Sequence, residues 1–378
     1  MKDRVKPYQY VLMIFCFVHG SKLLLSFMDN TVAHDAWLVT LFGFIVSVPF
    51  VLSYAFLARR FPGKNIVEIN ESVYGKVVGR IICALYILFI LYLVSLNLRI
   101  FSDFYTGNIL TETPPMTVLI VFMVCVAAVS VRLGIDAIAK AGVVIAAVIL
   151  ITEALTLLLL IGDMDFSNLL PVMNQPAPVY AHTTFVMAAI PYCELFIFMT
   201  VFPQIADKKR VGRLTVMGLA SSALLFLIIT LRNTVVLGES ESVYAITSFQ
   251  SVRMIAIGEF LTRVELLMAL GFTLSLFFKI SVLFYAASVS ISSALRLKTY
   301  NPVLWPMGAV TVLYAIVVHE STVSHTLIAA RYHVILTLPF EFILPPLTLL
   351  IARLRKLGGE NKRADGQPAD IAERAQNG

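Results

Sequence analysis

Charged residues are scarce in this chain, and this scarcity excludes a soluble domain with an ordinary hydrated surface. Only 14% of its 378 residues are Asp, Glu, Lys or Arg, whereas 59% are hydrophobic. Soluble domains carry roughly a quarter charged residues. The apolar residues instead form runs of about 20 residues, the length at which an α-helix crosses a ~30 Å hydrocarbon layer. The sequence therefore predicts an all-α integral membrane protein.

Cysteine pairs and catalytic signatures are also missing. The four cysteines stand singly in apolar runs, without CxxC spacing, which excludes a disulfide framework and the usual structural metal sites. The chain contains no GxSxG, HExxH or phosphate-binding Walker loop. We therefore expect no enzymatic activity, no cofactor and no metal; an intramembrane enzyme has no motif to support it.

Ten apolar runs predict the membrane spans. They occupy residues 8–28, 36–58, 81–105, 115–132, 141–162, 183–203, 214–237, 266–292, 302–319 and 334–353. We expect helices, because a helix satisfies its own backbone in lipid and the runs are too long for barrel strands. The first run follows a basic lead but has no small-residue cleavage site after it, so we interpret it as a span rather than a signal peptide.

The basic residues predict the orientation. With a cytoplasmic N-terminus, 22 of the 29 Lys and Arg residues lie on the cytoplasmic side. Only Arg253, Arg263 and Arg331 then lie outside, and the other four, Lys22, Arg99, Arg232 and Lys279, lie within spans. This bias follows the positive-inside rule and, with ten spans, places both termini in the cytoplasm. It also accounts for the net charge of +6 without nucleic acid as a partner.

Spans one and six contain the strongest breaks. Ten spans divide into two halves, about 8–162 and 183–353, and in inverted-repeat transporters the first helix of each half is discontinuous at the ligand site. A polar, Gly-containing quartet interrupts span one, and Pro191 removes a backbone donor in span six. The predicted ligand-binding residues are His19, Gly20, Ser21, Lys22, Ile190, Pro191, Tyr192, Cys193 and Glu194. Simple kinks, common in membrane helices, are the alternative.

A zwitterionic amino acid suits such a site. Backbone N–H groups of the broken helices would meet its carboxylate, and backbone carbonyls or Glu194 would meet its ammonium.

Ionisable residues within the spans are costly and indicate functional positions. Lys22 and Glu194 offset part of this cost if they face one another; alternatively Lys22 snorkels to the interface. We expect Arg99 and Arg232 at the outer interface. Lys279 either replaces a coupling cation or pairs with a carboxylate for packing. Residues with a possible cavity or coupling role are Asn97, Lys279 and Glu341, the last in a span bent by Pro339, Pro345 and Pro346.

Two polar stretches lie outside the spans. Apolar residues recur at near-helical spacing in the outer segment 238–265, which predicts a helix lying along the interface. We expect residues 1–357 to form the membrane domain. The segment 358–378 is rich in Gly, Ala and charge, which predicts a disordered cytoplasmic tail.

Several short stretches carry a family resemblance in their order and spacing. They are RRFPGK at 59–64, IVEI at 66–69, DAWL at 35–38, NLLPV at 168–172, IGEFLTR at 257–263, KIS at 279–281, YAA at 285–287 and YNP at 300–302. With them the chain resembles, over residues 6–355, the spore germination permease-like family. That family comprises the B subunits of Ger-type germinant receptors, within the amino acid–polyamine–organocation superfamily.

The resemblance implies a LeuT-like fold of ten helices in a 5+5 inverted repeat. It implies a receptor subunit in the inner membrane of a bacterial endospore that senses a small-molecule germinant, such as an amino acid, sugar or nucleoside. The implied partners are a Ger-type A subunit and a C-subunit lipoprotein. Lys22 stands where the family usually has a small or apolar residue, and Cys193 where a small residue is common. A secondary amino acid transporter of the same fold is the alternative, as is a scaffold without a ligand.

Overall fold

The computed structural model describes residues 5–207, 209–244, 246–254, 264–317 and 334–358. Within these residues the chain is almost entirely helical, and the sole β-type contact is a bridge between Val5 and Ile205. The longer helices are α1 (Pro7–His19), α2 (Leu24–Val32), α3 (Ala36–Arg60), α4 (Ile66–Tyr74), α5 (Lys76–Asn108), α6 (Pro115–Cys125), α7 (Ile135–Leu159), α8 (Ala177–Met187), α9 (Val211–Leu237), α10 (Thr247–Arg253), α11 (Glu265–Ala294), α12 (Asn301–Val317), α14 (Val334–Leu338) and α15 (Leu344–Leu354).

The predicted spans are helical. Seven helical stretches are long and apolar enough to cross a bilayer, and three shorter apolar helices, α1, α6 and α12, accompany them. Each of the ten predicted runs coincides with helical residues of the described chain. The chain is therefore an integral membrane protein.

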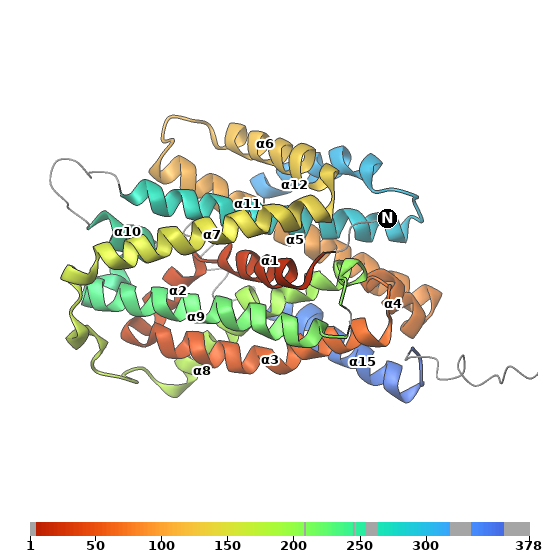
Figure 1. The fold of residues 1–378 in the computed structure, drawn as a ribbon, viewed down its shortest axis with the longest axis horizontal. Helices are drawn as coiled ribbons and strands as arrows, with labels where there is room; N and C mark the ends of the chain where they lie inside the picture. Colours follow the sequence, from red (N-terminus) through yellow and green to blue (C-terminus); the bar gives the residue numbers. More distant parts are fainter. Residues whose placement is uncertain (1–4, 208, 245, 255–263, 318–333, 359–378) are drawn as a thin grey trace, which may run out of the picture.

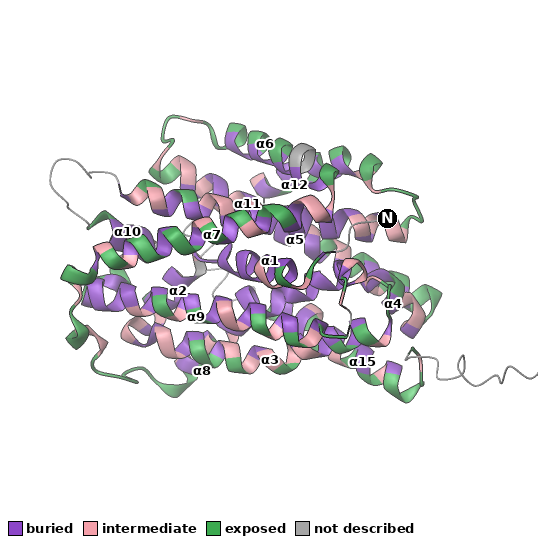
Figure 2. Cartoon of the chain, in the orientation of Figure 1, coloured by how far each residue is buried: buried purple, intermediate pink, exposed green. Residues whose placement is uncertain are grey.

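Large apolar side chains cover the outside of the bundle. Ile45, Leu88, Val121, Ile151 and Leu313, from five different helices, are each more than half exposed. A soluble monomer rarely shows so much contiguous apolar surface, whereas a bilayer solvates it. Figure 2 shows the complementary pattern: buried residues gather on α1, and exposed residues mark the outward surfaces of α6 and α15.

Helix α1 lies at the centre of the bundle, with α7, α9 and α11 packed around it (Figure 1). Two glycines allow close approach. A Cβ on Gly218 would lie 2.8 Å from Cβ of Ile14, and one on Gly142 would lie 2.8 Å from Cε2 of Phe278. Such small residues let membrane helices pack backbone to side chain, because packing rather than hydrophobicity holds them together in lipid.

One end of the bundle carries α4 and the C-terminal end of α15, and α10 lies toward the opposite end (Figure 1). Hydrogen bonds join the first end: Arg60 Nε donates to the Leu357 carbonyl at 2.6 Å, and Arg355 NH1 donates to the Val73 carbonyl at 3.0 Å. Helix α4 lies where the sequence analysis expected only a connection. Its start has a capping box between Asn65 and Glu68, a signal visible in the sequence.

The predicted outer helix is partly present. A 3₁₀-helix, η8 (Gly238–Val243), precedes α10, which buries Phe249 and Val252. Residues 255–263, including the whole IGEFLTR stretch, and the predicted tail beyond residue 358 lie outside the described residues.

Candidate functional site

The first predicted break is present in span one. Helix α1 ends at His19 and α2 begins at Leu24, so residues 20–23 separate two half-helices. Within the break, the Ser21 N–H donates to the Val18 carbonyl at 2.9 Å, and the Lys22 N–H donates to the His19 carbonyl at 3.0 Å. These tight i→i−3 turns replace the α-helical pattern. The polar quartet therefore interrupts the helix as predicted.

Gly20 has a steric role in this break. A Cβ at this position would lie 2.7 Å from Cβ of Lys279 and 3.0 Å from the Ser275 carbonyl oxygen. The first contact is shorter than side chains tolerate, and the second is tighter than most side-chain contacts. Gly20 therefore lets α11 approach the broken backbone of span one.

The second predicted break is present in span six. Helix α8 continues as a π-helical turn, η5 (Ala188–Tyr192), and then as a 3₁₀-helix, η6 (Cys193–Thr200). Pro191 lies in the π-helical turn, where its missing N–H disturbs the regular ladder. Ile190, Tyr192 and Cys193 are buried, and Glu194, at 1% exposure, lies in the first turn of the 3₁₀-helix.

Lys279 joins the two breaks. From α11, its Nζ lies 2.6 Å from Oε2 of Glu194 and donates a hydrogen bond to Oγ of Ser21. The same ammonium lies 5.4 Å from the centroid of the Phe17 ring. Lys279 is 1% exposed, so this ion pair is shielded from water. Three sequence-predicted residues, Ser21, Glu194 and Lys279, thus meet in one place, and Lys279 has the carboxylate partner considered for it.

Lys22 belongs to a different cluster. Its Nζ donates to Oε1 of Glu153 on α7, and NH1 of Arg232 on α9 lies 3.1 Å from Oε2 of the same carboxylate. Nε2 of His19 lies 3.7 Å from Glu153 Oε1. The predicted pairing of Lys22 with Glu194 is therefore wrong. Successive residues of such a turn point roughly 100–120° apart, so Ser21 faces α11 while Lys22 faces α7 and α9.

Two further expectations about the basic residues are wrong because these side chains are buried. Lys22 does not snorkel, because only 2% of it is exposed. Arg232 is also 2% exposed, although its place in the span predicted an interfacial position. Its guanidinium donates to Glu153, to Thr156 Oγ1 at 3.0 Å and to Asn233 Oδ1 at 2.9 Å. These partners make burial possible, since a buried charge needs a counter-ion and hydrogen bonds.

The other two candidate residues differ in their surroundings. Glu341 lies in a π-helical turn, η10 (Pro339–Ile343), which is the bend expected from the prolines of span ten. It is fully buried, neither carboxylate oxygen has a hydrogen-bond partner, and it lies within electrostatic range of Glu194 and Lys279. Asn97 donates to the Leu93 carbonyl at 2.8 Å, within its own helix α5.

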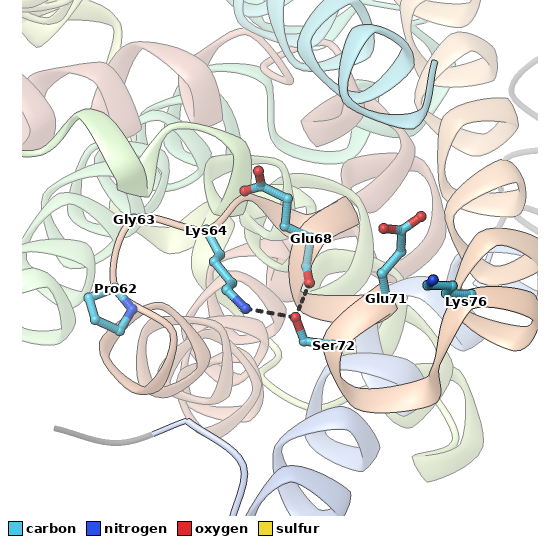
Figure 3. Close-up of a pocket in the computed structure, with 7 residues that line it drawn as sticks. All are labelled: Pro62, Gly63, Lys64, Glu68, Glu71, Ser72 and Lys76. Atoms are coloured by element: carbon cyan, nitrogen blue, oxygen red, sulfur yellow. Dashed lines mark hydrogen bonds between the residues drawn. The ribbon is translucent and has the colours of Figure 1, made fainter. Parts of the chain in front are cut away.

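A surface hollow of about 450 Å³ lies elsewhere, at the α4 end of the bundle (Figure 3). Lys64 Nζ donates to Ser72 Oγ at 2.8 Å, and Ser72 Oγ donates to the Glu68 carbonyl at 2.6 Å. These residues satisfy one another, and none of those lining the hollow belongs to the predicted site. In the part of the chain that the structure describes, no three His, Cys, Asp or Glu side chains gather as a metal site.

Chain-wide comparisons with known proteins agree with one another. The family model for "Spore germination protein" matches residues 4–323. Spore germination protein KB of Bacillus subtilis is 25% identical over 373 residues, covering 96% of this chain and 98% of its own length. Spore germination protein YndE of the same organism is 23% identical, covering 87% and 90%.

Two solved transporters share the fold. Mhp1, a nucleobase-cation-symport-1 family transporter, superposes with a TM-score of 0.67 at 13% identity, covering 94% of this chain and 92% of its own. MhsT in complex with L-phenylalanine gives a TM-score of 0.68 at 14% identity, covering 92% and 97%. The predicted LeuT-like arrangement, with helices one and six broken, is therefore confirmed.

Proposed function

Because this chain belongs to the spore germination protein family, we propose that it is the nutrient-sensing membrane subunit of a germinant receptor. It binds a small germinant, most simply an amino acid, between the breaks of spans one and six. The observation that carries this proposal is the convergence of Ser21, Glu194 and Lys279 at those two breaks.

The polar groups suit a zwitterionic ligand. Broken helices leave N–H and carbonyl groups that a carboxylate and an ammonium can use. Glu194 is the acidic group at the break, and Lys279 now occupies it. A ligand ammonium that replaces Lys279 at Glu194 would free the lysine and so change how α11 is held. MhsT, which shares the fold, is described with L-phenylalanine bound, which favours an amino acid as the first ligand to test.

The receptor proposal includes partners and a location. We place the chain in the inner membrane of the endospore with both termini cytoplasmic, in complex with a Ger-type A subunit and a C-subunit lipoprotein. Its two repeats cover about residues 8–162 and 183–353. The names of the relatives support germination as the process. The basic last turns of α3 and α15 also lie at the same end of the bundle, where Arg60 donates to the Leu357 carbonyl, consistent with a cytoplasmic face.

The test is germination of spores that lack this gene, with single amino acids, sugars and nucleosides as germinants and radiolabelled uptake measured in parallel. Loss of the response to one nutrient with unchanged uptake supports the receptor and identifies the germinant. Lost uptake with normal germination instead indicates a secondary transporter, the function of the fold relatives. Complementation with Glu194→Gln, at normal membrane abundance, is expected to leave the response lost.

A further inference from the structure

Two acidic side chains outside the proposed germinant site are buried and incompletely bonded. Asp29, on α2, and Glu241, on η8, are both 0% exposed. Oδ2 of Asp29 accepts a hydrogen bond from Thr247, and Oε2 of Glu241 accepts one from Thr234 at 3.1 Å. Their other oxygens, Asp29 Oδ1 and Glu241 Oε1, are buried without a hydrogen-bond partner. A buried carboxylate oxygen with no partner is costly and calls for a ligand.

The two carboxyl groups belong to one polar cluster between α2, α9 and α10. They lie within electrostatic range of each other. The Thr247 N–H donates to Ser26 Oγ at 3.0 Å, and Asn233 Nδ2 donates to Ser248 Oγ at 2.9 Å. The hydroxyls of Thr247 and Thr234 thus contact the two carboxyl groups, and Ser26 and Asn233 contact Thr247 in turn. Oxygen ligands of this kind suit a proton or a hard cation.

The charges of this region are out of balance. Asp29, Glu241 and Glu153 are three buried acids, whereas Lys22 and Arg232 are the two cations bound at Glu153. His19 lies beside the same two cations at Glu153, and their positive charges would repel a positive charge on its imidazole ring. Ionisable side chains on the neighbouring elements include His34 and Asp35 of η1 (Ala33–Asp35), Tyr180 and His182 of α8, Arg253 of α10, and the exposed Glu239 of η8. Among the residues that the structure describes, Asp29 and Glu241 therefore form no ion pair with a basic side chain, because Lys22 and Arg232 are bound at Glu153.

We propose that Asp29 and Glu241 form a binding site for one monovalent cation, either a proton or a sodium ion, and that its occupancy holds η8 and α10 against α2. The site lies on a different set of side chains from the germinant site, so the two proposals fail independently. We propose a monovalent rather than a divalent cation, because the two carboxyl groups offer one free oxygen each, fewer ligands than a divalent ion takes.

The experiment measures thermal unfolding of the full chain in detergent. A ligand that binds the folded state raises the unfolding temperature with its concentration. One series replaces choline chloride with sodium chloride at constant ionic strength and fixed pH. A second series lowers the pH in choline chloride. We expect a rise in at least one series for the wild type, the sodium series indicating a sodium ion and the pH series a proton.

The variants assign the effect to the pair. Asp29→Asn and Glu241→Gln are each expected to abolish the rise in unfolding temperature with sodium or with falling pH. Glu239→Gln, which changes an exposed neighbour on η8, should retain this rise in full. If a single variant does not fold, the double variant removes both charges together and serves in its place. The proposal is overturned if the wild type responds in neither series, or if the rise persists in both single variants.

Discussion

The ammonium of Lys279 lies 2.6 Å from Oε2 of Glu194, so one side chain of span eight closes the break in span six. The same ammonium donates to Ser21 at the break in span one. Spans one and six, which both lack regular α-helical hydrogen bonds at their breaks, are thus connected through α11. Removing or displacing this lysine should affect both breaks at once.

Lys279→Met tests this relationship. It leaves the buried Glu194 carboxylate without its cation, and breaking a buried pair from one side typically costs about 3–5 kcal/mol. We expect a marked fall in the unfolding temperature in detergent. The double variant Lys279→Met with Glu194→Gln removes the uncompensated charge and should recover most of the loss. If the double variant is no more stable than the single one, Lys279 acts through packing instead.

Gly20→Ala should weaken the contact between span one and α11. The added Cβ would lie 2.7 Å from Cβ of Lys279, an atom near the helix backbone that cannot move aside freely. Overpacking of this kind costs about 1–3 kcal/mol. We expect lower stability and a loss of germination by complemented spores. Gly107→Ala, in α5, is the matched control, since a Cβ there meets nothing within 4 Å; equal effects of the two would contradict the steric role of Gly20.

Glu153→Gln should destabilise the protein more than Lys22→Met. Glu153 binds both Lys22 and Arg232, so its neutralisation leaves two buried cations side by side, a loss of about 3–5 kcal/mol. Lys22→Met leaves Glu153 paired with Arg232. Unfolding temperatures in detergent compare the two variants. A lower unfolding temperature for Lys22→Met than for Glu153→Gln would contradict the role of Glu153 as the shared partner of the two cations. Glu71→Gln, which breaks a partly exposed pair with Arg80, should change stability by at most about 1 kcal/mol.

Glu341→Gln should separate function from stability. Neither carboxylate oxygen of Glu341 has a hydrogen-bond partner, so the amide forfeits no bond that the native side chain makes. We expect an unfolding temperature at or above that of the wild type. If Glu341 has the coupling role considered for it, the same variant gives spores that fail to respond to the germinant. A normal response would remove Glu341 from the coupling residues.

Much of the site could be predicted because its signals are local. Pro191 cannot donate a backbone hydrogen bond, and the polar quartet around Gly20 interrupts an apolar run, so both breaks are visible in the chain. The partners of the charged side chains were not visible. Whether Lys22 reaches Glu194 or Glu153 depends on the rotation of one short turn, and no property of residues 153 or 194 alone decides it.

The acidic pair was missed altogether. Asp29 lies at the end of an apolar run and Glu241 in a polar connection, so both read as ordinary residues near an interface. They are buried because η8 and α10 fold back over α2, a contact between segments more than 200 residues apart.

The sequence by itself determined that this chain spans a membrane, approximately where its spans lie, and where two of them break. These follow from hydrophobic length, backbone hydrogen bonding in lipid and the chemistry of proline and glycine. Only the tertiary structure decided which buried charges meet. Lys279 joined Glu194, and Lys22 and Arg232 joined Glu153, because helix packing brings these side chains together and an unpaired charge is costly in a low-dielectric interior.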